Sequence, residues 1–331
     1  MEEKTQNPNV EPAKEMTEAE LSELLQIRRD KLKALQDAGQ DPFRKVRYDQ
    51  QFYSTDITSN YDSFEDKTVS VAGRMMSKRI MGKASFAHIL DYKGDIQIYV
   101  KRDDIGEESY AQFKTFDIGD IIGVVGRVFK TRTGEISIHA EKVELLSKSL
   151  RPLPEKFHSI QDTELCWRRR YLDLCMNGET RRRFLFKSQL VREIRRYLED
   201  NGYIEIETPV LIDHPSGATA RPFVAHHNAL DMDVYLRIAP ETYLKRAIVG
   251  GFTKVFEFAR CFRNEGMDTT HLQDFTMLEG YCAYYNYRDN MRFLQDMLQT
   301  VITKIRGSAV ISINGTEIDF GAEWAVVTFR E

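Results

Sequence analysis

Residues 254–285 constrain the possible folds of this chain more than any other segment, because they have the pattern of two strands joined by a long loop. Val255–Arg263 and Phe275–Tyr284 are rich in aromatic and β-branched residues, and about ten residues that include Gly266 separate them. Alternate side chains of a strand point to the same face. Pairing of the two strands would bring an arginine, a phenylalanine, a glutamate and a tyrosine onto one face. Such a face is either a solvated surface with cross-strand ion pairs or a functional site.

The polar residues of this segment resemble motif 2 of the class II aminoacyl-tRNA synthetases, in which Arg-x-Glu precedes a loop and then His/Arg-x-x-x-Phe. Here Arg263 and Glu265 are followed by His271 and Phe275. These enzymes join an amino-acid carboxylate to the α-phosphorus of ATP, and an arginine that contacts both anions neutralises the growing charge. The resemblance implies that Arg263 is this catalytic residue. It also implies an ATP site in which Phe275 stacks under the adenine, Glu265 lies near the adenine amino group and His271 lies near the outer phosphates.

Composition limits the classes of function. A chain of 331 residues suggests about two domains, and a net charge of −4 means that any RNA contact must use local basic patches. The four cysteines have no CxxC pairing and no ligand-like spacing with histidine, so we expect reduced thiols and no metal site in this chain. Neither a signal peptide nor an apolar run of ~18 residues occurs, which predicts a cytoplasmic protein without membrane contact.

The pattern of elements predicts an α+β chain with an N-terminal five-stranded OB β-barrel and a second, antiparallel-sheet domain. We expect the following segments: a disordered tail at 1–15, a helical segment at 16–65, the barrel at 66–149, a proline-containing linker at 150–178, and the second domain at 179–331.

The barrel is predicted from five short strands between Thr68 and Leu146, with a helical patch at 107–116 between the third and fourth. Such barrels bind single-stranded nucleic acid through a basic groove with exposed aromatic residues. The segment around Phe86 resembles the anticodon-binding barrel of the class IIb synthetases, which are the lysyl, aspartyl and asparaginyl enzymes. The resemblance implies that Phe86 stacks on the central uridine of the anticodon, that Gln97 reads its edge, and that Arg74 supports the contact. Phe86 as a barrel-core aromatic is the alternative.

The helix expected before the barrel begins at a cap around Thr17 and ends near Gly39. Its polar face is expected to carry Arg28, Arg29, Lys31 and Lys33. This is either a solvated face on a helix that packs against the barrel or a surface for the RNA backbone.

A second helix is expected at 180–200, followed by an Asn-Gly stop, a strand and a proline. Its expected apolar face consists of Phe184, Phe186, Leu190, Val191, Ile194, Tyr197 and Leu198. This order resembles class II motif 1, which implies a homodimer interface where Pro209 touches the partner's site. An amphipathic helix without a partner is the alternative.

Residues 216–223 and 235–246 resemble segments of the lysyl enzymes in particular. Pro240 is suited to the first position of a helix, which places Glu241 in the first turn, where the helix dipole favours a carboxylate. The resemblance implies a lysine-binding set that consists of Gly217, Glu241, Arg263, Glu279 and Tyr281. Gly217, Glu241 and Glu279 would serve the α-ammonium, Arg263 the carboxylate and Tyr281 the side-chain ammonium.

Two elements are expected after the second strand of the motif. A helix at about 287–306 should turn Met291, Leu294, Met297, Leu298, Val301, Ile302 and Ile305 to one face. The hairpin at 310–320 should turn at Asn314-Gly315 with type I′ geometry.

Taken together, the resemblance implies a lysine–tRNA ligase that uses ATP, L-lysine and tRNA(Lys) and forms a homodimer. The glycine-rich motif 3 of the family is missing from the sequence, which predicts a catalytically incomplete, C-terminally truncated chain, with the Mg²⁺ ligands in the missing part. Two alternatives stay open: a non-catalytic module that binds tRNA or dimerises, and a class IIb ligase for aspartate or asparagine. The segment Arg237–Arg246 argues against the aspartate and asparagine ligases.

Overall fold

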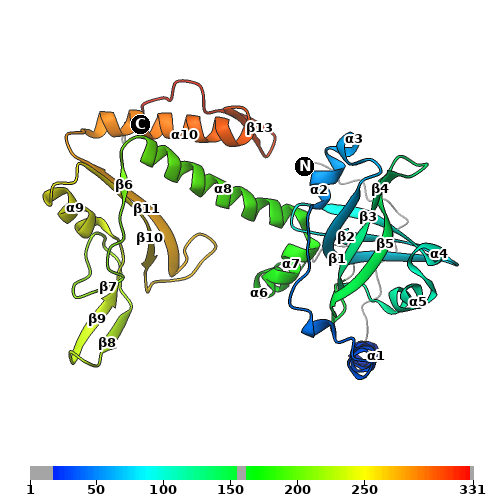
Figure 1. Cartoon of the computed structure of the whole chain (residues 1–331). Coiled ribbons are helices and arrows are strands. Elements are labelled where there is room, and N and C mark those ends of the chain that lie inside the picture. Colours follow the sequence, from blue (N-terminus) through cyan, green and yellow to red (C-terminus); the bar gives the residue numbers. More distant parts are fainter. Residues whose placement is uncertain (1–17, 155–161, 329–331) are drawn as a thin grey trace, which may run out of the picture. The chain divides into compact units, whose positions relative to one another are not determined.

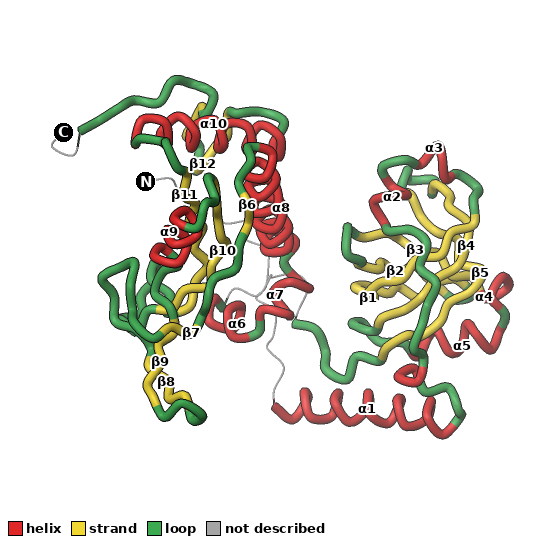
Figure 2. The backbone as a smooth tube through the Cα atoms, turned by 60° about the vertical axis from the view of Figure 1, so that its left-hand side comes forward, coloured by secondary structure: helices red, strands yellow, loops and turns green. Residues whose placement is uncertain are grey.

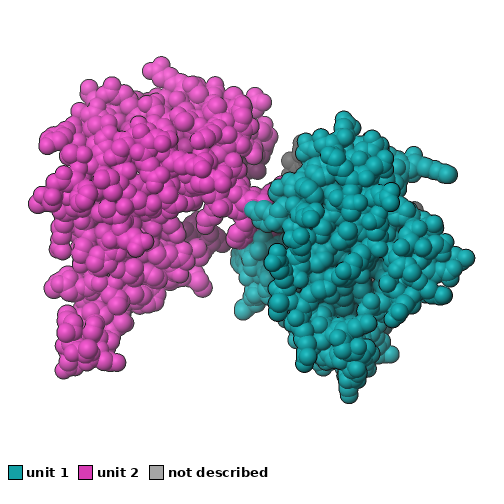
Figure 3. Space-filling model, viewed as in Figure 1, with its two compact units in different colours: residues 1–178 teal, residues 179–331 magenta. Residues whose placement is uncertain are grey.

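The computed structural model describes residues 18–154 and 162–328, which form two compact units at 1–178 and 179–331 (Figure 3). The expected tail at 1–15, the cap at Thr17 and part of the expected linker lie outside the described residues. In the described parts of the chain, no helix has both the length and the apolar character needed to cross a membrane.

The first unit contains the expected five-stranded barrel (Figures 1 and 2). Its strands close in the order β1-β2-β3-β5-β4, with β3 and β5 parallel and the other pairs antiparallel. The strands are β1 (Thr68–Met81), β2 (Ala84–Leu90), β3 (Asp95–Lys101), β4 (Ile121–Lys130) and β5 (Ile136–Ser147), and α4 (Arg102–Ile105) and α5 (Glu107–Thr115) lie between β3 and β4. The OB fold predicted from the strand pattern is therefore confirmed.

Strand alternation decides which side chains of the barrel face inward. On β2 the buried residues are Ser85, Ala87 and Ile89, whereas Phe86 between them is only partly buried and is not part of the hydrophobic core. The alternative in which Phe86 is a core aromatic is therefore wrong. The core is filled instead by aliphatic residues of all five strands and by Tyr110 and Phe113 of α5.

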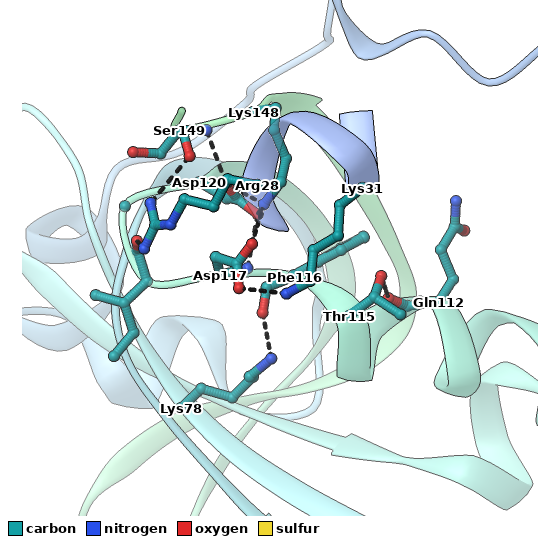
Figure 4. A network of polar contacts seen from close by, with 12 residues as sticks. Arg28, Lys31, Lys78, Gln112, Thr115, Phe116, Asp117, Asp120, Lys148 and Ser149 are labelled. Atoms are coloured by element: carbon teal, nitrogen blue, oxygen red, sulfur yellow. Dashed lines mark hydrogen bonds and ion pairs between the residues drawn. The ribbon is translucent and has the colours of Figure 1, made fainter. Parts of the chain in front are cut away.

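Helix α1 (Glu18–Asp37) is anchored to the barrel by two basic side chains, Arg28 and Lys31 (Figure 4). Arg28 is 5% exposed, and its guanidinium donates to the carbonyl oxygens of Ile118, Ser149 and Arg151. Lys31 pairs with Asp117 at 2.6 Å. A solvated polar face is therefore the wrong interpretation for Arg28, whose guanidinium is buried against backbone carbonyls, whereas Lys31 is partly exposed and paired with a carboxylate of the same unit.

The remaining short helices of the first unit connect and flank these parts. They are η1 (Pro42–Arg44), α2 (Ser54–Thr58), α3 (Tyr61–Phe64), α6 (Thr163–Arg168) and α7 (Arg170–Met176).

The second unit contains three small sheets and three helices within the described residues. The sheet orders are β11-β10-β6, β7-β9-β8 and β12-β13. The strands are β6 (Ile204–Glu205), β7 (Leu211–Ile212), β8 (Val224–His227), β9 (Met232–Leu236), β10 (Lys254–Phe262), β11 (Asp274–Cys282), β12 (Val310–Ile313) and β13 (Thr316–Asp319), and the helices are α8 (Gly178–Asp200), α9 (Glu241–Val249) and α10 (Tyr287–Arg306). Strands β10 and β11 pair antiparallel as expected, while β6 joins β10 in parallel.

Helices α8 and α10 pack on one side of the central sheet (Figure 1). The core between them includes Leu198, Phe256, Met297 and Val301. The apolar faces predicted for α8 and α10 are buried only along the part of each helix that contacts this core.

Four residues depart from those predicted faces. Phe184 and Phe186 of α8 are 50% and 39% exposed, and Met291 and Leu294 of α10 are 45% and 50% exposed. Phe293, which does not belong to the predicted face, packs against the core in their place. Helical spacing alone therefore does not predict which side chains of α8 and α10 are buried. The position of the core against which each helix packs decides it.

The hairpin at the end of the described chain has the predicted turn. Asn314 and Gly315 have φ values of 51° and 82°, the two positive values that a type I′ turn requires.

Candidate functional site

The pairing of β10 and β11 creates the face that the sequence predicts. Glu257 lies opposite Glu279, and Cys261 lies opposite Phe275. Arg263 follows Cys261 by two positions, so the guanidinium, the phenyl ring and the carboxylates come from one side of the sheet.

Arg263 and Phe275 form one end of this face. The Cζ atom of Arg263 lies 5.1 Å from the centroid of the Phe275 ring. The Nε atom of Arg263 is buried and has no hydrogen-bond partner among the described residues. Together with Glu265, His271 and Gln273, these side chains line a cavity of about 280 Å³. A guanidinium with a buried, unused Nε–H above an aromatic ring can bind an anion attached to a flat base.

Two other predicted residues of this end lie on the loop between β10 and β11. The Oε1 atom of Glu265 accepts a hydrogen bond of 3.1 Å from the backbone N–H of Arg221, which holds the loop against the segment before β8. His271 is exposed, and its Nδ1 atom lies 2.7 Å from Asp268. Hydrogen bonds from Thr270 and His271 lower the pKa of Asp268 well below its usual range. The imidazole of His271 is therefore held by its own loop, at the rim of the cavity.

The other end of the face is acidic. Gly217 has φ +87°, and a Cβ atom at this position would lie 2.9 Å from the Cβ atom of Glu241. The Tyr281 hydroxyl donates a hydrogen bond of 2.9 Å to Glu279. Helix α9, which carries Glu241, packs against β11, which carries Glu279 and Tyr281. The structure thus groups four of the five residues expected to bind lysine, and Arg263 lies on the same sheet face.

Lys245 belongs to this acidic end and is absent from the sequence-based interpretation. Its Nζ atom lies 2.6 Å from Glu241 and 5.8 Å from the centroid of the Tyr281 ring. The Lys245 ammonium group therefore lies at the acidic end of the face, where the nearby carboxylates stabilise a positive charge. The sequence signal is the i, i+4 spacing of Glu241 and Lys245, which also occurs on many helices without a site.

Burial raises the pKa of Glu279, and the negative charges of Glu241 and Glu257 raise it further, whereas the hydrogen bond from Tyr281 opposes the shift. The same burial and the neighbouring carboxylate raise the pKa of Tyr281. A site with this electrostatic character favours the binding of a cation.

Glu279→Gln is expected to raise the melting temperature at pH 7 and to leave it nearly unchanged at pH 4. The folded pKa of Glu279 lies above its ordinary value of 4.5, so the protonated form is favoured in the folded protein. The stability of the wild type that depends on a protonated Glu279 is fully present below pH 4.5 and is lost as the pH rises through the folded pKa. Glutamine does not ionise, so the variant does not lose this stability at pH 7. Thermal unfolding at the two pH values measures this difference. A glutamine variant that is less stable than the wild type at pH 7 would contradict the proposed cost of ionising Glu279.

A buried ion pair supports the sheet beneath the site and has no counterpart in the sequence-based interpretation. Arg237 and Glu257 are each 5% exposed in their side chains and lie 2.6 Å apart. Thr208 donates a hydrogen bond of 2.6 Å to the second oxygen of Glu257, and the Nε atom of Arg237 donates to the carbonyl of Arg260. Pro209 follows Thr208 and is exposed, so the predicted interface residue lies on the surface directly beside this network.

A second candidate site lies on the outer face of the barrel. It is a groove of about 790 Å³ that contains Phe86, Gln97, Tyr99 and Phe129. The rings of Phe86 and Tyr99 have centroids 4.9 Å apart. Two of the three residues predicted to read the anticodon are therefore neighbours in one groove.

Arg74 lies elsewhere. Its guanidinium donates a hydrogen bond of 2.7 Å to the carbonyl of Gly119, and it lines a different hollow with Leu21 of α1. Arg79 is the arginine of β1 that lines the groove, because the strand register places it opposite Phe86. Only the register of β1 with β2, which local sequence patterns do not specify, distinguishes the two arginines.

The described residues contain no group of three or more His, Cys, Asp or Glu side chains arranged to hold a metal ion. No disulfide joins any two of Cys166, Cys175, Cys261 and Cys282, all of which lie in the described part of the chain.

Comparison with known proteins places both units in families. Residues 162–331, about half of the chain, match the family model of the tRNA synthetases class II (D, K and N). Residues 69–146 match the model of the OB-fold nucleic acid binding domain.

Similar curated proteins carry the name lysine–tRNA ligase. The chain is 50% identical over 311 residues to the protein of Clostridium acetobutylicum, 49% over 318 residues to that of Syntrophomonas wolfei, and 49% over 310 residues to that of Enterococcus faecalis. These alignments cover 94%, 96% and 92% of this chain but 60%, 64% and 62% of the relatives. The chain therefore spans about three-fifths of the length of the curated relatives it matches.

Proposed function

Because this chain belongs to the class II tRNA synthetases (D, K and N), we propose that its activity is that of a lysine–tRNA ligase, which forms lysyl-adenylate from lysine and ATP and transfers lysine to tRNA(Lys). The similarity to three lysine–tRNA ligases supports this proposal. The main structural support is the sheet face that has a guanidinium with a buried, unused donor at one end and carboxylates at the other.

In the proposed first step, a carboxylate oxygen of lysine attacks the α-phosphorus of ATP, and pyrophosphate leaves. Arg263 would contact both anions, and its Nε–H, unused among the described residues, adds to the donors available for the charge that grows during attack. Phe275 would stack under the adenine, with Glu265 and His271 at the rim of the same cavity. Mg²⁺ would supply charge neutralisation at the ATP phosphates, and its protein ligands are proposed to lie in the part of the relatives that this chain does not span.

The acidic end would orient the two ammonium groups of lysine. Glu241, Glu279 and the carbonyl of Gly217 are proposed to hold the α-ammonium, and Tyr281 the side-chain ammonium. Lys245 now pairs with Glu241 and would move away when the substrate binds. The carboxylates of Glu241, Glu257 and Glu279 repel a further negative charge at this end, which favours lysine over aspartate.

Amino-acid-dependent ATP–pyrophosphate exchange tests the proposal. It should be measured on the chain itself and on a version extended by the part of the relatives that the chain does not span, with lysine, aspartate and asparagine as substrates. Exchange with lysine alone supports the proposed activity. Exchange with aspartate or asparagine assigns a different ligase, and a lack of exchange in both versions favours the non-catalytic module.

We also propose that the barrel groove binds the anticodon of tRNA(Lys), with the central base between Phe86 and Gln97. Aromatic rings at the surface of an OB barrel stack on bases, and Arg79 would contact the RNA backbone or the base edge. Homodimerisation through the surface around Pro209, and a cytoplasmic location in which the thiols stay reduced, belong to the same proposal.

Phe86→Ala is expected to weaken the binding of tRNA(Lys) by about 1–3 kcal/mol, because one base loses its stacking platform. Filter binding at constant salt measures the change. Unchanged affinity would remove Phe86 from the RNA site.

Arg79→Ala and Arg74→Ala form a matched pair for the same assay. Both remove one arginine from β1, but only Arg79 lines the groove. Arg79→Ala should weaken binding and reduce its salt dependence by about one phosphate or base contact, whereas Arg74→Ala should leave the affinity nearly unchanged. The reverse result would return the role to Arg74.

A further inference from the structure

The loop between β7 and β8 contacts residues from both ends of the candidate face. Near its start, the hydroxyl oxygens of Ser216 and Thr242 lie 2.8 Å apart, so one hydroxyl donates a hydrogen bond to the other. Near its end, the backbone N–H of Arg221 donates a hydrogen bond of 3.1 Å to Glu265. Residues 216–221 therefore connect the first turn of α9 with the loop between β10 and β11.

Gly217, the residue after Ser216, has its backbone directly against the start of α9. A Cβ atom at this position would lie 2.9 Å from the Cβ atom of Glu241 and 3.1 Å from that of Ala239. Its φ of +87° is a conformation that glycine adopts without strain. The peptide groups of Gly217 are therefore close to Glu241, with which the Gly217 carbonyl is proposed to share the α-ammonium of lysine.

The contact between the two hydroxyls is well placed to fix this closeness. Ser216 is the neighbour of Gly217 in the chain, and Thr242 is the neighbour of Glu241. No other hydrogen bond among the described residues joins residues 213–220 to another element. A shift of this loop along α9 would therefore have to break the contact between the hydroxyls, and it would carry the Gly217 carbonyl away from Glu241.

We propose that Ser216 and Thr242 are positioning residues for lysine: their hydrogen bond holds the backbone of Gly217 beside Glu241 and so completes the site for the α-ammonium. An ammonium group donates up to three hydrogen bonds, which a carboxylate and a carbonyl at a fixed separation can accept together. Without the contact between the hydroxyls, part of the binding free energy of lysine would be used to order the loop. This inference rests on the proposed activation of lysine and adds the residues that set the affinity for its α-ammonium.

The test is lysine-dependent ATP–pyrophosphate exchange in the extended version of the chain, for the wild type, Ser216→Ala and Thr242→Val. Each variant should raise the KM for lysine by about two- to tenfold, the loss expected for one neutral hydrogen bond, and change kcat by less than about twofold. The double variant should have a KM no higher than that of the more impaired single variant, because both substitutions break the same bond. Thr242→Ser keeps a hydroxyl and should restore the KM.

Inhibition of the exchange by ε-aminocaproate identifies the group of lysine that is affected. This compound has the carboxylate and the distal ammonium of lysine but no α-ammonium. Its inhibition constant should be the same for the wild type and both single variants, because it does not use the site that the loop completes. If the inhibition constant rises as much as the KM for lysine, the substitutions disturb the whole site and the positioning role is refuted.

Thr276→Val is the matched control. Thr276 lies on β11 between Phe275 and Met277, so its side chain is on the face of the sheet opposite to the site. Its hydroxyl accepts a hydrogen bond of 3.2 Å from Arg260. This variant also loses a hydroxyl and one hydrogen bond, and it should leave the KM for lysine within about twofold of the wild-type value.

The outcomes separate this inference from the proposed function. If the wild type activates lysine and both single variants keep its KM, or if their losses add up in the double variant, the hydroxyls do not act as a pair and the inference is refuted. If the wild type shows no lysine-dependent exchange, the proposed function fails, and this inference fails with it.

Discussion

Arg263→Ala is expected to lower lysine-dependent ATP–pyrophosphate exchange by about 10²–10³-fold in the extended version of the chain, because it removes a preorganised group that stabilises charge in the transition state. The guanidinium lies above Phe275 and has a buried donor without a partner among the described residues, so the position is ready for an anion. We expect Arg263→Lys to retain little more activity, since an ammonium cannot form the two parallel hydrogen bonds of the guanidinium fork. Steady-state exchange at varied lysine and ATP concentrations measures the loss.

Arg260→Ala is the control for this experiment. Arg260 lies on β10 three positions before Arg263 and is about half exposed. It pairs with Asp274 of β11 on the face of the sheet opposite to Arg263. Its removal should change the exchange rate by less than about threefold, roughly the effect of an exposed ion pair. A loss of less than about tenfold for Arg263→Ala would contradict the proposed catalytic role, because a charge-stabilising group contributes more than that.

Arg237→Met is expected to lower the free energy of unfolding of the second unit by about 3–5 kcal/mol, because it leaves the buried carboxylate of Glu257 without its cation. Both side chains are 5% exposed and the hydrogen-bonded atoms are 2.6 Å apart. Hydrogen exchange of the β10 and β11 backbone amides reports the loss in this unit specifically.

Two variants complete this test. Arg260→Met removes an exposed arginine from β10, the strand that carries Glu257, and should cost no more than about 1 kcal/mol. The double variant Arg237→Met/Glu257→Met removes both buried charges and should recover most of the stability lost in the single variant. If Arg237→Met costs no more than Arg260→Met, the buried pair does not stabilise the sheet.

Most of the architecture could be predicted from local patterns. The alternation of apolar residues between Thr68 and Leu146 predicted all five barrel strands, and Asn314-Gly315 predicted the type I′ turn. The spacing of Arg263, Phe275 and Glu279 predicted a shared face; the strand register places Phe275 and Glu279 on it, and Arg263 lies over the ring of Phe275. These features depend on the strand period of two and on the backbone preferences of a few residues.

The details of the candidate sites depended on contacts between distant segments. Sequence alone could not distinguish Arg74 from Arg79, because that choice depends on the register of β1 with β2. It also could not show that the buried Ser137 of β5 donates a hydrogen bond to Gln97 of β3, since the two residues meet through parallel pairing of strands that are far apart in the chain.

The sequence by itself determined the barrel, the paired strands of the central sheet and the kinds of side chain on their common face. Only the tertiary structure decided that Arg28 is buried, that Arg237 and Glu257 form an internal ion pair, and that Lys245 lies against the acidic end of the site. The physical reason is that secondary structure follows from local backbone geometry, whereas the environment of a charge follows from the segments that fold against it.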